Sequence, residues 1–241
     1  MNADVTLIEA LPAPLARVLG RDVGAEIMRM NTAAGVDVRC GAAVSGTRAG
    51  TRGRELLLDG GGTIRADVVV VGLGVSPATG WLEGSGLIVN DGIVCDPRGR
   101  TSAPAVWAAG DVARWWHPLY REHVRMEHWT SASEQGATVA RDLLGRSEQL
   151  AQVPYFWSDL YDVKIQVLGR PRPDDDVELV RAPLGAGQPL VLYGRGGRLT
   201  AVLGISRPKD IMRMRSLLAE QVSMGAAVAA AQSDALASLK M

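Results

Sequence analysis

The chain has 241 residues, and its 26 Lys and Arg residues balance its 26 Asp and Glu residues, so the formal net charge is zero. This balance argues against a surface built to bind nucleic acid. The only two cysteines, Cys40 and Cys95, stand far apart without a CxxC pair, which excludes a disulfide scaffold and a cysteine-based metal site within the chain. With three histidines in all, we expect no metal site.

No apolar run approaches the roughly 18 residues of a membrane span. The first residues lack both the cationic and the apolar region of a signal peptide. We therefore expect no membrane association and a cytoplasmic location.

The first third of the chain predicts a βαβ unit. Residues 5–9 form a β-branched run, and apolar residues recur at three- and four-residue steps over 15–34, as in an amphipathic helix. Gly35 ends this helix and a second strand starts at 36–38. Strands at about 55–59 and 63–65 then flank three glycines, which predicts a hairpin.

The middle of the chain predicts buried strands that lead into small residues. The valine run 68–71 is typical of a strand buried on both faces, and Gly72-Leu73-Gly74 follows it directly. After a hairpin-like region at 92–99, residues 105–109 predict another buried strand, which ends in Gly110-Asp111. A helix is expected over 130–144, closed by Gly145.

The composition shifts near residue 151, where we expect a second, smaller domain. Strands are predicted at about 162–168, 177–182, 189–195 and 199–206, with Gly196-Gly197 as a two-residue hairpin turn. A helix over 207–220 and an Ala-rich helical tail follow. The sequence thus predicts an α/β fold with domains at 1–150 and 151–241.

Glu9 and the two glycines of the 72–74 segment are candidate nucleotide-binding residues. An acid at the end of a strand in a βαβ unit can accept hydrogen bonds from both hydroxyls of an adenosine ribose, although a plain surface acid fits as well. Gly72 and Gly74 would let a ligand approach the backbone closely, but a tight turn also needs glycine.

The segment from Thr101 to Asp111 carries a more specific pattern. Small residues run into Gly110-Asp111, where Gly110 leaves room for a phosphate or polyol and the Asp111 carboxylate can accept a hydrogen bond from a hydroxyl group. The alternative is that Asp111 caps the N-terminus of a helix.

This segment resembles the second flavin-binding motif of the FAD-dependent pyridine-nucleotide reductases. Residues 155–162 resemble the start of the C-terminal domain of the ferredoxin and rubredoxin reductases, and residues 127–136 resemble their flavin-contact segment. The resemblance covers nearly the whole chain. It implies a partial Rossmann-like NAD/FAD-binding region, with an NAD part at about 1–75 and an FAD part at 76–150, followed by a smaller α+β C-terminal reductase domain that docks the acceptor.

The resemblance also implies cofactors and site residues. FAD and NADH would be the cofactors, with electrons passing to a ferredoxin or rubredoxin. Glu9 would hold the adenosine ribose and favour NADH, Gly72 and Gly74 would line the nicotinamide side, and Gly110 and Asp111 would bind FAD, Asp111 through the ribitol. Glu127, Trp129 and Trp157 would surround the flavin ring. For Trp157 the alternative is a core tryptophan, and for Glu127 a surface acid.

Complete members of that family carry two glycine-rich nucleotide loops that this sequence lacks, so we expect an incomplete chain that is poorly soluble and colourless when expressed alone. Two other functions stay open at this stage. A disulfide reductase of the same superfamily needs a C-terminal His–Glu pair, whereas no histidine follows His128. An inactive remnant could keep only a partner-binding C-terminal domain.

A group of basic residues in the C-terminal part is either a solvated face or a landing site for an acidic ferredoxin. The group comprises Arg170, Arg172, Arg195, Arg198, Arg207, Lys209, Arg213 and Arg215.

Overall fold

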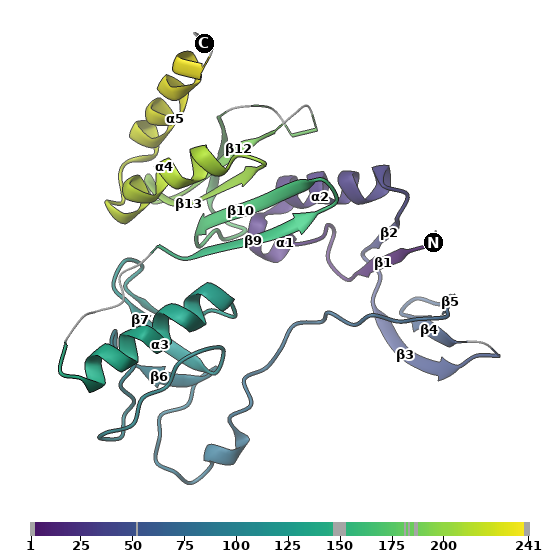
Figure 1. Cartoon of the computed structure of the whole chain (residues 1–241). Helices are drawn as coiled ribbons and strands as arrows, with labels where there is room; N and C mark the ends of the chain where they lie inside the picture. The colour runs from purple at the N-terminus through teal and green to yellow at the C-terminus, as the bar shows by residue number, and fades with distance from the viewer. Residues whose placement is uncertain are drawn as a thin grey trace.

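A computed structural model describes residues 3–51, 53–146, 153–180, 182, 184–185 and 188–238. In these residues the strands form four sheets, with the orders β1-β2, β3-β4-β5, β6-β7-β8 and β11-β12-β13-β10-β9. Figure 1 shows the five-stranded sheet between two helical layers, with α1 and α2 on one side and α4 and α5 on the other. Within these described ranges, no helix has the length and apolar character needed to cross a membrane.

The predicted βαβ unit is confirmed. Its elements are β1 (Thr6–Glu9), α1 (Ala16–Leu19), α2 (Arg21–Ala33) and β2 (Asp37–Cys40). The two strands are parallel, and Glu9 lies opposite Cys40 at their carboxyl ends. The single helix expected over 15–34 is divided at Gly20, whose φ of 80° and ψ of 169° lie outside the helical region.

The next sheet is an antiparallel meander of β3 (Val44–Ala49), β4 (Arg54–Leu58) and β5 (Thr63–Ala66). The hairpin predicted between its last two strands is confirmed. All three glycines of the turn, residues 60–62, have positive φ, which explains why glycine is needed there.

The strand predicted at 68–71 is wrong. Val68, Val70 and Val71 are 78%, 91% and 70% exposed, and no described strand pairs with this segment. A valine run becomes a buried strand only where a neighbouring strand supplies hydrogen bonds and other elements cover both faces. Figure 1 shows the chain leaving β5 as an open connection that leads to the short 3-10 helix η1 (Gly80–Leu82).

The following part contains β6 (Ile93–Cys95), β7 (Ala113–His117), β8 (Glu122–Arg125) and α3 (Trp129–Leu143). β6 pairs with β7 in parallel, and β7 and β8 form a hairpin that the sequence did not reveal. Trp115 fills the core of this part at 1% exposure. Gly99 must be glycine, because a Cβ atom there would lie 2.4 Å from the Trp115 ring.

The strand predicted at 105–109 is also wrong, whereas the predicted helix is confirmed as α3. Residues 100–111 form an irregular segment with one isolated bridge, between Arg100 and Trp107, and Ala105 has a φ of 58°. A positive φ at a non-glycine residue is incompatible with a regular strand. Gly145 follows α3 with a φ of 73°, as expected for a glycine that ends a helix.

The C-terminal part matches the prediction closely. Its elements are β9 (Tyr155–Leu160), β10 (Val163–Gly169), β11 (Asp176–Leu179), β12 (Leu190–Arg195), β13 (Arg198–Ile205), α4 (Pro208–Ala219) and α5 (Met224–Ser238). Only β9 was not expected. Gly196 and Gly197 have φ values of 57° and 74°, as a two-residue hairpin turn with positive φ at both positions requires.

Both faces of the C-terminal sheet are covered. Alternate residues along β12 face opposite cores: Leu190 and Leu192 pack with α4 and α5, while Val191 and Tyr193 pack with α1 and α2. The Tyr193 hydroxyl donates a buried hydrogen bond of 2.9 Å to the Leu19 carbonyl oxygen. The βαβ unit and the C-terminal sheet therefore share a hydrophobic core, and the domain boundary near residue 150 stays a prediction.

Replacement of Tyr193 by Phe tests this shared core. Tyr193→Phe should lower the free energy of unfolding by about 1–2 kcal/mol, because it leaves a buried carbonyl oxygen without its donor. Urea denaturation provides the measurement. The matched control is Tyr161→Phe, whose hydroxyl donates to Asn31 on α2 but whose side chain is 53% exposed. A loss no larger for Tyr193→Phe than for Tyr161→Phe would contradict this account of the contact.

Candidate functional site

A pocket of about 240 Å³ lies where the first turn of α3 meets strand β9. Two segments that are distant in sequence form it: residues 127–130, which lead into α3, and Phe156 with Trp157 on β9. Three of the residues predicted for the flavin environment, Glu127, Trp129 and Trp157, therefore line one pocket. Its volume is below the roughly 300–1,000 Å³ of a complete small-molecule site, so it has room for part of a larger ligand.

The hydrogen bond between Thr130 and Tyr155 fixes the two walls of the pocket. The Thr130 hydroxyl donates to the Tyr155 carbonyl oxygen at 2.6 Å, which ties the first turn of α3 to the start of β9. His128 precedes the helix in an extended conformation, with φ −111° and ψ 134°. The change from extended to helical backbone at this residue sets the direction in which the neighbouring side chains leave the chain.

The pocket walls are aromatic. Trp157 stacks against Tyr155 with 5.5 Å between ring centroids, and Phe156 lies against His128 at 4.9 Å. Trp129 and Trp157 are nevertheless 79% and 41% exposed. Large exposed aromatic side chains gathered at one place are a mark of a binding site, because apolar surface left in water carries a free-energy cost.

Charged groups stand around this aromatic wall. The Lys164 ammonium lies 5.7 Å from the centroid of Trp157 and 3.6 Å from an Asp159 carboxylate oxygen. Glu127 forms an ion pair with Arg125, which also reaches the Asp91 carboxylate at 3.2 Å. The rim of the pocket thus carries cationic groups and carboxylates, while aromatic rings form its wall.

His128 has an unusual environment. Burial lowers the pKa of its imidazole, and the negative charges of Glu127 and Asp111 only partly oppose this effect. Its Nδ1 atom is buried and has no hydrogen-bond partner among the residues that the structure describes. A neutral imidazole with a free ring nitrogen can donate to or accept from a polar ligand.

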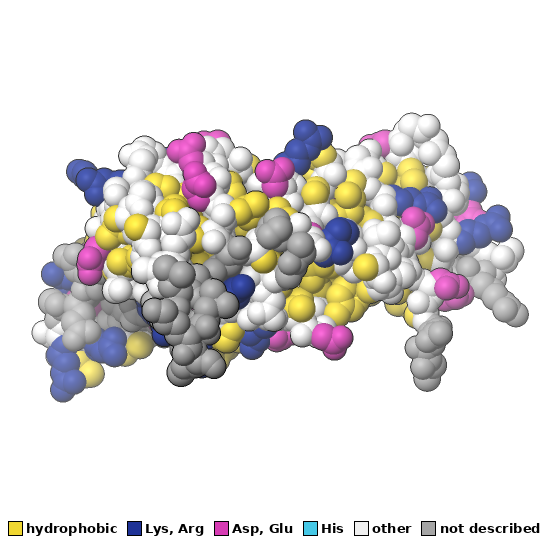
Figure 2. Space-filling view, turned by 90° about the horizontal axis from the view of Figure 1, so that it is seen from above, with side chains coloured by type: hydrophobic (Ala, Val, Ile, Leu, Met, Phe, Trp, Pro, Cys, Tyr) yellow, Lys and Arg dark blue, Asp and Glu magenta, His cyan; other side chains and the backbone are white. Residues whose placement is uncertain are grey.

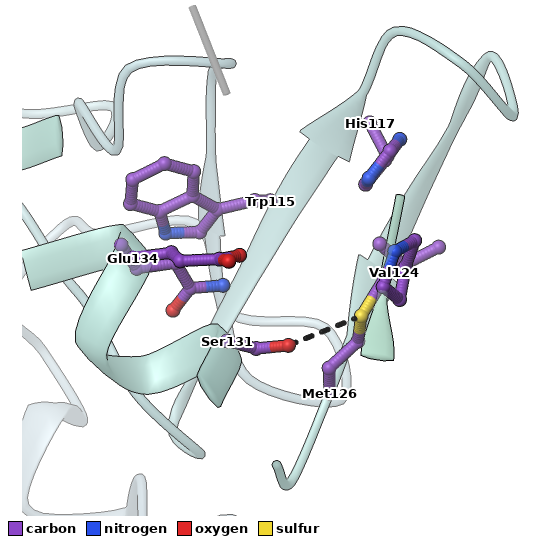
Figure 3. Close-up of a pocket in the computed structure, with 8 residues that line it drawn as sticks. Trp115, His117, Val124, Met126, Ser131 and Glu134 are labelled. Carbon is purple, nitrogen blue, oxygen red and sulfur yellow. Dashed lines mark hydrogen bonds between the residues drawn. The ribbon is translucent and has the colours of Figure 1, made fainter. Parts of the chain in front are cut away.

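A second, much smaller cavity lies between β7, β8 and α3 (Figure 3). It has a volume of about 10 Å³ and is lined by Trp115, His117, Val124, Met126, Ser131, Glu134, Gln135 and Pro154. The space suits about one water molecule and no organic ligand. Burial raises the pKa of the Glu134 carboxyl group beside it.

The remaining predicted residues do not line the aromatic pocket. Glu9 lies at the carboxyl end of β1 as predicted, and its carboxylate accepts a hydrogen bond of 2.9 Å from the Leu11 backbone amide. Gly72 and Gly74 lie on the exposed connection after β5, and a Cβ atom built at either would meet nothing within 4 Å. Their nucleotide-binding roles stay predictions.

Asp111 lies in the turn that leads into β7, and its side chain is exposed. The alternative that it caps a helix is wrong, because a strand follows it. Its carboxylate is close enough to influence the pKa of His128. Gly110 has a φ of 81°, and its amide donates to the Gln135 side chain at 2.8 Å.

Sequence reasoning assigned no role to several residues that shape this site. Thr130 and Phe156 line the pocket, and Asp142 and Arg100 hold the segment that carries Asp111. The sequence contained one usable signal, namely that Phe156 and Thr130 adjoin predicted site residues. The long-range pair between Arg100 and Asp142 has no local signal.

In the part of the chain that the structure describes, no group of three or more His, Cys, Asp or Glu residues could hold a metal ion.

Several of the basic residues in the predicted landing site form ion pairs within the protein. Glu122 binds Arg170 and Arg172, and Asp175 binds Arg195 at 2.6 Å. In the view of Figure 2, basic and acidic side chains are interspersed. These pairs favour a structural role for the three arginines.

Comparisons with known proteins agree with this geometry. The family described as pyridine nucleotide-disulphide oxidoreductase matches residues 1–136, and a family described as reductase C-terminal matches residues 155–240. The chain belongs to the pyridine nucleotide-disulphide oxidoreductase family and carries the α/β fold and the C-terminal reductase domain expected from the sequence.

The relatives of the chain include ferredoxin reductases. The chain is 35% identical over 221 residues to the ferredoxin–NAD(+) reductase component of the anthranilate 1,2-dioxygenase system of Burkholderia cepacia, covering 91% of this chain and 54% of that protein. It is 31% identical over 224 residues to putidaredoxin reductase of Pseudomonas putida, covering 92% and 53%. The chain thus spans about half the length of these relatives.

A solved structure is also similar. The crystal structure of a covalent complex of putidaredoxin reductase with putidaredoxin superposes with a TM-score of 0.86 at 30% sequence identity, covering 92% of this chain and 54% of that one.

The lowered pKa of His128 predicts a specific dependence of stability on pH. Because the folded protein binds this proton more weakly than the unfolded chain, the stabilisation from neutral His128 is present above the ordinary histidine pKa of about 6.5 and is lost as the pH falls below it. His128→Gln should flatten this part of the curve of unfolding free energy against pH.

Urea denaturation at several pH values between 5 and 8 is the measurement. His123→Gln is the control, since His123 lies on the neighbouring strand β8, against Trp116. If the control flattened the curve as much as His128→Gln, the burial of His128 would not be the cause.

Proposed function

We propose that this chain forms the NADH- and flavin-binding part of a reductase that passes electrons from NADH through FAD to a ferredoxin or rubredoxin. The observation that carries the proposal is the meeting of Glu127, Trp129 and Trp157 in one aromatic pocket. Family membership and the similarity to ferredoxin reductases support it. We also propose a cytoplasmic location, as expected from the sequence.

The residues present fit a flavin. Trp129 and Trp157 offer flat apolar faces to a conjugated ring. When bound, FAD would supply the step from two-electron to one-electron chemistry that links NADH to an iron–sulfur acceptor. The protein would bind, orient and shield the ring, with Gly110 and Asp111 holding the ribitol.

For the nicotinamide nucleotide, we propose that Glu9 accepts hydrogen bonds from the adenosine ribose and that Gly72 and Gly74 line the nicotinamide side. The position of Glu9 at the carboxyl ends of two parallel strands supports its role, since ligands of open α/β sheets bind at that edge. The exposed Trp157 would lie on the route to the acceptor.

Titration of the purified chain with FAD, followed by flavin and tryptophan fluorescence, tests the flavin site. Because the chain is expected to be colourless as isolated, FAD is added in excess, and we expect weak but saturable binding. Trp157→Ala or Trp129→Ala should raise the dissociation constant about tenfold or more, because a stacked aromatic side chain contributes about 1–3 kcal/mol. Trp81→Ala is the matched control, since Trp81 is 78% exposed but lies outside the pocket. An equal effect of all three substitutions would count against the site.

A partner-binding module without turnover is the second candidate. The hydrophobic core between the C-terminal sheet and helices α4 and α5 favours it, because the buried residues of this core all come from the C-terminal part of the chain. Mixing the FAD-loaded chain with a [2Fe–2S] ferredoxin, and measuring association separately from NADH oxidation, distinguishes the two functions. Association without oxidation supports the module.

A further inference from the structure

Helix α3 buries polar side chains rather than apolar ones. Its buried residues are Ser131, Gln135, Thr138 and Asp142, which share one face because they are spaced by three and four positions. Buried polar groups are uncommon and need hydrogen-bond partners. Thr138 donates to the Glu134 carbonyl oxygen of the same helix, whereas Gln135 and Asp142 find their partners in another segment of the chain.

Asp142 has the most demanding position on this face. Its side chain has 0% exposure, and its two oxygens accept hydrogen bonds from Arg100 Nε at 2.6 Å and Arg100 Nη2 at 2.8 Å. The indole Nε1 atom of Trp107 donates a third hydrogen bond at 2.9 Å. Both partners belong to the irregular segment 100–111, which ends in Gly110-Asp111.

Gln135 forms a second attachment to the same segment. Its side-chain oxygen accepts the Gly110 amide at 2.8 Å. Gln135 and Asp142 are seven residues apart, which is about two helical turns. The helix thus holds the segment at both of its ends.

The segment has a single isolated bridge and no regular strand, and Val106 is 40% exposed. Its other contacts include neutral ones, such as the hydrogen bond of 2.8 Å from the Trp115 indole to the Ala108 carbonyl oxygen, whereas the contact of Arg100 with Asp142 is charged. The guanidinium group of Arg100 and the indole of Trp107 lower the pKa of Asp142, so the carboxylate is charged at neutral pH. Charge-assisted, bidentate hydrogen bonds are stronger and more directional than neutral ones.

We propose that Asp142 is a positioning residue of the flavin site, which holds segment 100–111 against α3 so that Gly110 and Asp111 are presented to the ribitol. This inference rests on the proposed flavin-binding function. Asp142 does not itself touch the cofactor and acts through Arg100 and Trp107.

Asp142→Asn in the full chain is the first test. Asparagine keeps the size of the side chain but cannot accept both Arg100 hydrogen bonds. Amide hydrogen exchange in residues 100–111 should accelerate at least tenfold, the Trp107 indole resonance should shift, and the dissociation constant for FAD should rise about tenfold. Asp22→Asn, an exposed carboxylate on α2, should leave all three unchanged.

Trp107→Phe removes only the indole donor and leaves the pair of Arg100 with Asp142. It should produce an intermediate acceleration of exchange, and it decides the question if Asp142→Asn fails to fold. Unchanged exchange in residues 100–111, or an acceleration spread evenly over the whole protein, would overturn the positioning role. If the wild-type chain bound no FAD, the proposed function would fail. The exchange data would still show whether Asp142 holds residues 100–111 against α3.

Discussion

The hydrogen bond between the Thr130 hydroxyl and the Tyr155 carbonyl oxygen is the contact on which the candidate site depends. It joins helix α3, which belongs with the β6–β8 sheet, to the edge strand β9 of the five-stranded sheet. Glu127 and Trp129 enter the pocket from one side of this junction and Trp157 from the other. Either part alone would carry only half of the aromatic wall.

Two further features hold the site in shape. The polar face of α3 fixes the segment that ends in Asp111, through Gln135 and Asp142. Arg170 and Arg172 on the C-terminal side bind Glu122 on β8, which links the same two parts of the molecule. Polar contacts thus position the segments of the candidate site, whereas apolar packing stabilises the five-stranded sheet.

Local patterns were enough to predict most elements. The helical periodicity of residues 15–34, the glycines of the hairpin turns and the alternation of the C-terminal strands depend on residues close in sequence. The grouping of Glu127, Trp129 and Trp157 came from the resemblance of two short segments to a known family, because no local rule places β9 beside the start of α3.

The errors occurred where structure depends on distant partners. Residues 68–71 have the composition of a buried strand, but pairing and coverage decide whether such a run is buried. Residues 105–109 were expected to form a strand, whereas hydrogen bonds to Asp142, more than thirty residues later, hold them in an irregular path. The ion pairs of Arg170 and Arg172 with Glu122, and of Arg195 with Asp175, were likewise not predictable, because only the fold brings these groups together.

Oxidative footprinting of the tryptophans with and without FAD tests the central claim most directly. Trp129 and Trp81 are equally exposed in the chain, at 79% and 78%, and Trp157 is 41% exposed. If the aromatic pocket binds the flavin ring, FAD should protect Trp129 and Trp157 from oxidation and leave Trp81 unchanged. Equal protection of all three, or none at Trp129 and Trp157 at saturating FAD, would contradict the account.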